Sequence, residues 1–352
     1  MNAGVQLYRE DEGNRGTGND PVIEVKDLRI SIPLDEGLLT PVRGISFSIS
    51  RGEVLGIVGE SGCGKSLSAR AILGINEKRC RTEGEILFYM DGVVQDLLKL
   101  KYGSEEIRKI RGKSASMIFQ EPMVAFHPMY TIGDQIIESC LLHITQDKRE
   151  AKKITLEMMN RVGIANAERR FDQYPHEFSG GMLQRALIAM ALICRPSLLI
   201  ADEPTTALDV TIQAQILDLM KQLQKEFGMA ILFITHDLGI MARMCDRLAV
   251  MYLGKIVEEA SVKEIYKNPR HPYTQGLISS VHKLGTHKQE KLFSIEGTVP
   301  LALNVKRACG FYERCKRRIE GQCDRLEPEL RDTGGGHWVN CFLYENQEET
   351  RD

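Results

Sequence analysis

Apolar and polar positions follow three successive patterns along the chain. Over residues 21–120, short apolar runs are separated by turn-forming segments such as residues 35–37, which predicts an antiparallel β flank around the first strands of a core. Over residues 132–194 the apolar positions recur mostly at helical spacing, which predicts a helical subdomain at about residues 121–195. Residues 197–260 return to strand, helix and strand, so the whole pattern predicts an α/β fold.

A glycine-rich loop lies between the apolar run 54–58 and a helix that starts near Leu67. It fits G-x-x-x-x-G-K-[ST] at every fixed position, with the residues Gly59, Glu60, Ser61, Gly62, Cys63, Gly64, Lys65 and Ser66. The glycines of such a loop let backbone N–H groups approach phosphates, the lysine reaches the β- and γ-phosphates, and the serine hydroxyl ligates Mg²⁺. A chance match in a turn is the alternative, but the flanking strand and helix favour a nucleotide-binding loop.

A second apolar strand, residues 198–201, ends in the two carboxylates Asp202 and Glu203. We expect Asp202 to hold Mg²⁺, directly or through water, and Glu203 to orient and polarise the water that attacks in an in-line phosphoryl transfer. An Asp-Glu pair is often only a solvated strand end. The segment 204–209, which follows at once, argues against that explanation.

Other short motifs follow in a fixed order. Gln120 comes after an apolar run, the segment 178–182 (Phe-Ser-Gly-Gly-Met) lies between two strands, and a third apolar strand ends at His236. Together with the glycine-rich loop, the Asp-Glu pair and Ala207-Leu208-Asp209, this order resembles that of the ABC-type ATPases. The resemblance implies a P-loop nucleotide-binding domain with a RecA-like core, an antiparallel β flank and a helical subdomain.

In that family the ATP site is shared by two subunits in a head-to-tail dimer. The resemblance therefore implies that Ser179, Gly180, Gly181 and Met182 serve the ATP bound to the partner, where a hydroxyl and closely approaching amides at a helix start can clamp a phosphate. Met182 stands where glutamine is commonest. We expect little loss from this change, because the clamp lies mainly in the preceding serine and glycines.

The resemblance also assigns work to single residues. Gln120 would sense Mg²⁺ and the attacking water, His236 would contact the γ-phosphate, and Asp209 would act at the dimer seam. The aromatic residue that usually stacks on adenine is replaced by Ile32. An aliphatic contact would then replace ring stacking, so we expect weaker ATP binding.

Composition fits a globular subunit, with 43% hydrophobic and 27% charged residues. The 46 basic and 48 acidic residues nearly balance, so net charge gives no support for a nucleic-acid surface. The longest apolar segment, residues 186–194, is far shorter than the roughly 18–20 residues that span a bilayer. Residues 1–20 are polar and have no apolar centre, unlike a secretory signal, so we expect a flexible cytoplasmic tail.

The C-terminal part narrows the resemblance. The segments 271–274 (His-Pro-Tyr-Thr), 297–300 (Gly-Thr-Val-Pro) and 309–315 (Cys-Gly-Phe-Tyr-Glu-Arg-Cys) together resemble the ATP-binding subunits of oligopeptide and dipeptide ABC importers. The expected division is an ABC ATPase domain at residues 21–268 and a small cysteine-containing extension at residues 269–352.

This resemblance implies an ATPase at the cytoplasmic face of the cell membrane that hydrolyses MgATP and drives a separate channel. The implied partners are a second ATPase subunit, commonly a distinct one in this group, two membrane permeases and, indirectly, an extracytoplasmic peptide-binding protein. Nickel importers share the architecture, which leaves the solute open. A soluble ABC-type ATPase acting on nucleic acid or ribosomes is disfavoured by the short stretch between Lys65 and Ser179 and by the single ATPase module. A regulatory scaffold without turnover is disfavoured by the presence of Glu203 and His236.

Four of the nine cysteines, Cys309, Cys315, Cys323 and Cys341, crowd into the extension as C-x5-C-x7-C-x17-C. Disulfides are disfavoured in a reducing cytoplasm, and zinc sites usually contain a tight cysteine pair, which is missing here. Iron–sulfur clusters tolerate wider spacing, and some relatives among the peptide-importer ATPases carry a [4Fe–4S] cluster in this region. We therefore expect a cluster, with Zn²⁺ or unliganded thiols as the alternatives, and we expect His337 to be a surface residue rather than a ligand.

Overall fold

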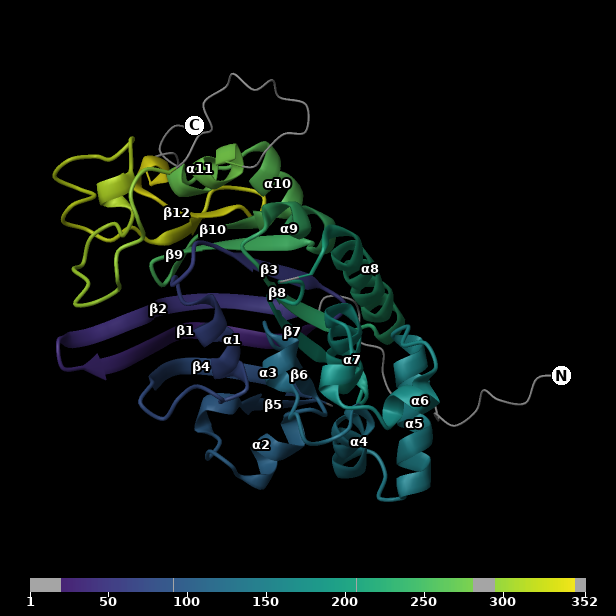
Figure 1. The fold of residues 1–352 in the computed structure, drawn as a ribbon. Coiled ribbons are helices and arrows are strands. Elements are labelled where there is room, and N and C mark those ends of the chain that lie inside the picture. Colours follow the sequence, from purple (N-terminus) through teal and green to yellow (C-terminus); the bar gives the residue numbers. More distant parts are fainter. Residues whose placement is uncertain (1–19, 91, 207, 281–294, 346–352) are drawn as a thin grey trace.

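The computed structural model describes residues 20–90, 92–206, 208–280 and 295–345, which form two β-sheets with helices around them (Figure 1). The predicted tail, except for Asp20, lies outside the described residues, and so does the end of the extension after residue 345.

The larger sheet has the strand order β11-β12-β10-β9-β3-β8-β7-β6. Strands β9, β3, β8, β7 and β6 run parallel, whereas β10, β12 and β11 are joined by antiparallel pairing. The bounds are β3 Val54–Val58, β6 Ala115–Ile118, β7 Leu198–Asp202, β8 Ala230–Ile234, β9 Arg247–Tyr252, β10 Lys255–Ser261, β11 Leu330–Asp332 and β12 Trp338–Asn340. The parallel strands are almost wholly buried because helices or the second sheet cover both faces.

The smaller sheet is antiparallel, in the order β2-β1-β4-β5, with β1 Pro21–Leu34, β2 Gly37–Ser50, β4 Arg81–Met90 and β5 Val93–Asp96. Helix α1 (Lys65–Ile72) contacts strands of both sheets and therefore lies between them. Successive residues of β7 show how the pleat divides the core. Leu198 and Ile200 face α1 and the smaller sheet, whereas Leu199 and Ala201 face the other helices.

The remaining helices cover the larger sheet and extend from it. Helices α3 to α7 make up the region predicted as a helical subdomain, and α4, α5 and α6 lie at the far end of the molecule from the yellow C-terminal region (Figure 1). The bounds are α2 Glu105–Ile110, α3 Pro122–Ala125, α4 Ile132–His143, α5 Lys148–Arg161, α6 Ala167–Phe171, α7 Gly180–Leu192, α8 Val210–Phe227, α9 Leu238–Met244, α10 Val262–Lys267 and α11 Pro272–Ser280. Short 3₁₀ helices occupy Leu97–Lys99, Pro175–Glu177, Tyr312–Arg314 and Phe342–Tyr344. In the described part of the chain, every helix is too short or too polar to cross a membrane.

The C-terminal region is tied to the larger sheet rather than separate from it. Strand β12 pairs antiparallel with β10, and β11 pairs with β12, so the sheet ends in strands from the extension. Thr40 donates its backbone N–H to the carbonyl of Ala302 at 2.7 Å, which connects the extension to β2 as well. The extension therefore lies within contact distance of the loop that follows β3.

Candidate functional site

The glycine-rich loop connects β3 to α1 and closes on itself around Lys65. The Lys65 ammonium donates to the carbonyl of Gly59 at 2.8 Å and to that of Glu60 at 3.0 Å, and only 7% of the residue is exposed. Gly64 has φ of 102°, and a Cβ built there would lie 2.3 Å from the carbonyl oxygen of Pro41. Glycine is therefore required at this position both for the backbone conformation and for the close approach of β2.

Ser66 and Asp202 lie together at the ends of α1 and β7. The Ser66 hydroxyl donates to Asp202 Oδ1 at 3.0 Å, and Asp202 is 1% exposed. Burial raises the pKa of Asp202, while the hydrogen bond from Ser66 and the nearby cations Arg70 and Lys65 act in the opposite direction. A hydroxyl and a carboxylate oxygen are the hard ligands that Mg²⁺ prefers, so this pair fits the predicted magnesium position.

Glu203 is the centre of a small polar network. Its carboxylate accepts hydrogen bonds from Gln120 Nε2 at 2.9 Å and Thr206 Oγ1 at 3.0 Å, and its Oε1 lies 3.2 Å from His236 Nδ1. The backbone of Glu203 has φ of 48°, a left-handed conformation that costs a non-glycine residue about 1–3 kcal/mol. Its N–H is satisfied by the carbonyl of Ile234 at 2.8 Å. The end of β8 thus holds Glu203 in a strained conformation that directs its carboxylate to the other predicted catalytic residues.

Most of these groups line one open cleft of about 620 Å³, whereas Asp202, like Gly59, Glu60 and Cys63 of the loop, does not line it. Its lining residues are Ser61, Gly62, Gly64, Lys65, Ser66, Leu67, Gln120, Glu203, Thr206 and His236. The size lies within the range of pockets that hold nucleotide-sized ligands. Ser61 and His236 are separated by more than 150 positions along the chain and were predicted from separate motifs. The fold nevertheless brings both to the same cleft.

The segment around Ser179 is exposed and does not line this cleft. Ser179 is the N-cap of α7, and its hydroxyl accepts the N–H of Met182 at 3.4 Å. Gly180 is exposed, whereas Gly181 and Met182 are half-buried. A helix start that is open to solvent and outside the lining of the chain's own cleft is the arrangement expected of a group that serves a second subunit.

Two other predicted site residues also lie outside the cleft lining. Asp209 is exposed and is the N-cap of α8, accepting the N–H of Ile212 at 2.9 Å. Ile32 is 9% exposed and sits opposite Leu39 in the pairing of β1 with β2. The structure therefore gives Asp209 a capping role, and it places Ile32 in the smaller sheet, outside the lining of the cleft.

The four cysteines of the extension are neighbours. Burial, with smaller contributions from the neighbouring Cys323, Cys341 and Cys315, raises the pKa of Cys309 to about 12. Burial likewise raises the pKa of Cys341 to about 11. Cys309 also donates its N–H to the carbonyl of Cys323 at 2.9 Å.

The thiols are nevertheless not arranged as a finished metal site. Across the described ranges, no group of three or more His, Cys, Asp or Glu side chains is placed to hold a metal ion. Neutral thiols have no charge to attract a cation and must lose protons before they bind one. The cysteines therefore fit a metal centre in number and neighbourhood but not in their present geometry.

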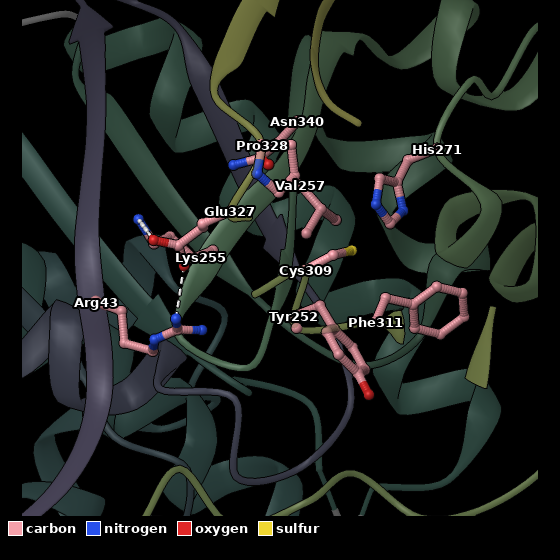
Figure 2. Close-up of a pocket in the computed structure, with 11 residues that line it drawn as sticks. Arg43, Tyr252, Lys255, Val257, His271, Cys309, Phe311, Glu327, Pro328 and Asn340 are labelled. Atoms are coloured by element: carbon pink, nitrogen blue, oxygen red, sulfur yellow. Dashed lines mark hydrogen bonds and ion pairs between the residues drawn. The ribbon is translucent and has the colours of Figure 1, made fainter. Parts of the chain in front are cut away.

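A second, much smaller cavity of about 20 Å³ lies beside Cys309 (Figure 2). His271, Cys309 and Phe311 lie on one side of it, and the ion pair of Arg43 with Glu327 lies on the other. Its volume suffices for about one water molecule, so it is a packing feature rather than a ligand site.

The expectation that His337 is a surface residue is wrong. Only 1% of His337 is exposed, and its Nε2 lies 2.6 Å from Glu258 Oε1 on β10. Glu258 is fully buried and also accepts the backbone N–H groups of Arg270 at 2.6 Å and His271 at 2.9 Å. The buried carboxylate explains the discrepancy, because it supplies the partner that a buried histidine needs.

Sequence reasoning missed three residues near the loop. Thr206 lines the cleft and bonds Glu203, and Tyr273 and Arg314 contact Glu60 from the C-terminal region. Thr206 could have been found from its place in the segment that follows Asp202 and Glu203, after Pro204 and Thr205. No sequence signal marks the contacts of Tyr273 and Arg314, since they depend on how the chain folds back.

Comparisons with known proteins find relatives that match most of the chain. A family model described as ABC transporter matches residues 42–206, and one described as the C-terminal region of oligopeptide/dipeptide transporters matches residues 257–323. The chain is 46% identical over 332 residues to the dipeptide transport ATP-binding protein DppD of Bacillus subtilis (strain 168), covering 94% of this chain and 97% of that protein. It is 43% identical to the oligopeptide transport ATP-binding protein OppD of Haemophilus influenzae, covering 92% of this chain and 98% of that protein.

Solved structures show the same fold. The dimeric post-hydrolysis state of the ATP-binding cassette MJ0796, bound to ADP and Pi, matches with a TM-score of 0.60 at 26% identity, covering 68% of this chain and 98% of that one. CbiO1 of Clostridium perfringens, part of an ABC transporter complex, matches with a TM-score of 0.58 at 28% identity, covering 71% of this chain and 92% of that one. The predicted fold class is confirmed.

Proposed function

The chain belongs to the ATP-binding proteins of the peptide-importing ABC transporters, and on this basis we propose that it hydrolyses ATP to drive import of oligopeptides or dipeptides. The observation that carries the proposal is the cleft at the glycine-rich loop, in which Glu203 meets Gln120, Thr206 and His236. The cleft combines a phosphate-binding loop with a carboxylate held for proton transfer, which is what hydrolysis of a nucleoside triphosphate requires.

The residues of the cleft divide the work. The loop amides and Lys65 bind the phosphates, which requires the lysine to exchange its bonds with the carbonyls of Gly59 and Glu60 for phosphate oxygens. Ser66 and Asp202 are the residues that would hold Mg²⁺, which neutralises phosphate charge when bound. Glu203 orients and polarises the attacking water. Gln120 and His236 contact the Glu203 carboxylate and keep it in place.

The variant Glu203→Gln tests this assignment. Glutamine can still accept from Gln120 and Thr206 while its NH₂ donates to His236, so we expect normal folding and ATP binding. Hydrolysis should fall by about 10²–10⁴-fold, the usual contribution of a positioned base. Glu226→Gln, which changes a half-exposed carboxylate on α8 that pairs with Arg161 of α5, is the matched control. A Glu203→Gln protein that hydrolyses ATP near the wild-type rate would remove Glu203 from this role.

We assign the exposed Ser179-Gly180-Gly181-Met182 segment to the ATP site of a second ATPase subunit, in a head-to-tail dimer with Asp209 at the seam. Ser179 and Gly180 are exposed and do not line the chain's own cleft, which supports this arrangement. The second subunit is a distinct ATPase of the same family. Mixing experiments test this point: the isolated chain with Glu203→Gln should form few ATP-dependent dimers alone and many with the correct partner.

The permeases bind near the segment that follows Gln120. Four apolar side chains there are largely exposed, namely Met123 (60%), Val124 (77%), Met129 (75%) and Tyr130 (58%). Exposed apolar side chains gathered in one short segment are typical of a protein contact. The subunit would then work at the cytoplasmic face of the membrane, and the extracytoplasmic peptide-binding protein would reach it only through the permeases.

The extension carries the proposed [4Fe–4S] cluster on Cys309, Cys315, Cys323 and Cys341, with Zn²⁺ as the alternative. The proximity of the four thiols supports it, and its role would be to staple a segment with a small core. Purification of the chain from its native membranes, followed by mass spectrometry and by iron and zinc analysis, tests partners and metal together. Co-purifying permeases with about four irons per chain would support both proposals. Ribosomal or DNA-bound partners would overturn the transport proposal, and a metal-free chain would overturn the cluster.

A further inference from the structure

Glu60, inside the phosphate-binding loop, is held by two residues from the C-terminal region. The Arg314 guanidinium forms a two-pronged ion pair with its carboxylate, with Nη1 2.9 Å from Oε2 and Nη2 3.2 Å from Oε1. The backbone N–H of Glu60 donates to the Tyr273 hydroxyl at 3.0 Å. The side chain and the main chain of one loop residue are thus both fixed from beyond residue 268.

Arg314 is itself rigidly placed. Its Nε donates to the carbonyl of Glu296 at 2.9 Å, its Nη2 donates to that of Gly297 at 3.1 Å, and its guanidinium lies 5.7 Å from the centre of the Tyr252 ring. Only 7% of the Arg314 side chain is exposed, against 28% for Glu60. A buried arginine with most of its donors engaged holds its partner in one geometry, unlike the mobile pairs of a protein surface.

The position of Glu60 matters for ATP in two ways. Its carbonyl oxygen is one of the two that hold Lys65 before ATP binds, so the position of Glu60 sets where the lysine lies when it exchanges these bonds for phosphate oxygens. Its carboxylate is also an anion in the loop that binds a triphosphate, and like charges at this range repel. With Arg314 in place, Glu60 is neutralised and is absent from the residues that line the cleft.

We propose that Arg314 is a positioning residue for the phosphate-binding loop, which turns the Glu60 carboxylate away from the cleft and cancels its charge. This inference rests on the proposed ATP site. It makes the C-terminal region part of the nucleotide-binding machinery, although Arg314 touches no nucleotide itself.

A double-mutant cycle on the full-length chain tests the proposal, with the dissociation constants of ATP and ADP as the readout. Arg314→Gln should weaken ATP binding about tenfold, a size typical of coupling between a site and a residue that acts on it indirectly. ADP, which carries less charge, should be affected less, and added salt should shrink the ATP defect. Arg314→Lys should restore binding in part, because lysine keeps the charge but lacks the two-pronged geometry.

The decisive comparison is made in the Glu60→Gln background. With the carboxylate neutral, Arg314→Gln should cost little further affinity, whereas a purely structural arginine would cost the same in both backgrounds and would overturn the proposal. If Arg314→Gln does not fold, Arg314→Lys in the two backgrounds gives the same comparison. Arg325→Gln, an exposed arginine of the extension paired with Asp324, is the control and should bind ATP normally.

The outcomes separate this inference from the proposed function. A wild-type chain that does not bind ATP would overturn the ATP site itself. A wild-type chain that binds ATP while Arg314→Gln binds it equally well would overturn only the positioning role.

Discussion

Glu258 offers the sharpest test of how the C-terminal region is attached. Its carboxylate is fully buried on β10 and faces three donors, with the N–H of Arg270 and His337 Nε2 on Oε1 and the N–H of His271 on Oε2. Burial alone would raise the pKa of Glu258, but His337 and the Thr274 hydroxyl, followed by the two amides, outweigh it and leave the pKa lowered. The site is therefore built for a carboxylate.

The variant Glu258→Gln removes the charge and one acceptor. The glutamine NH₂ must face either the His271 amide or the other two donors, so at least one buried donor is left unsatisfied, at a cost of about 1–3 kcal/mol. The remaining bonds lose their charge assistance, about 1 kcal/mol each. The expected sum is about 3–5 kcal/mol, in line with the cost of breaking a buried pair.

Because the lost contacts attach residues 270–271 and β12 to β10, the loss should appear as local opening of the C-terminal region. Limited proteolysis and amide hydrogen exchange under native conditions measure it directly. Glu329→Gln, which changes an exposed carboxylate paired with Arg331, is the matched control and should change neither readout. Equal protection of the C-terminal region in Glu258→Gln and wild type would refute this account of its attachment.

Three further predictions follow from single residues of the structure. Lys65→Ala should abolish ATP binding in a fluorescent-nucleotide titration, because its ammonium is the cation of the phosphate-binding loop; retained binding would contradict its role. His271 is fully buried, and burial lowers its pKa to about 4, so the folded chain keeps it neutral while the unfolded chain protonates it near pH 6.5. The contribution of His271 to the free energy of unfolding is therefore present above pH 6.5 and is lost as the pH falls toward 4, by about 3 kcal/mol. A free energy of unfolding in urea that stays constant over this pH range would contradict this prediction. Ile32→Tyr should tighten ATP binding by supplying a ring for adenine, and equal affinities of variant and wild type would refute the expected weakness of base recognition.

The phosphate-binding loop and the carboxylates after β7 could be predicted because their evidence is local. Position 64 has a left-handed backbone and lies against Pro41, and both constraints exclude any residue but glycine. The resulting glycine is visible within one short motif. Asp202 and Glu203 stand at the end of an apolar strand, where a parallel sheet places ligand-binding groups. The family resemblance assigned Gln120 to Mg²⁺ and the attacking water and His236 to the γ-phosphate, but it did not predict their contacts with the Glu203 carboxylate.

The contacts of the C-terminal region could not be predicted, because each depends on a partner far away in the sequence. His337 follows three glycines and precedes an exposed tryptophan, a context typical of a surface loop. Its burial is possible only because Glu258 meets it across the pairing of β12 with β10, and that pairing leaves no periodic pattern in the sequence.

The burial of Arg314 likewise depends on a partner, Glu60, that lies even farther away in the sequence. A buried arginine looks in sequence like any solvated cation, and only its distant carboxylate makes its burial favourable. Since Tyr273 and Phe311 lie in the main hydrophobic core and polar pairs also attach the C-terminal region, the predicted boundary at residue 268 marks a change of sequence motif more than a physical division. Glu258 of the ATPase domain holds the C-terminal region, and Arg314 of the C-terminal region holds the phosphate-binding loop.

Deleting the residues after 268 should therefore leave Glu258 and Glu60 without their partners. A truncated chain that binds ATP as tightly as the whole chain would contradict the view that the two regions form a single unit.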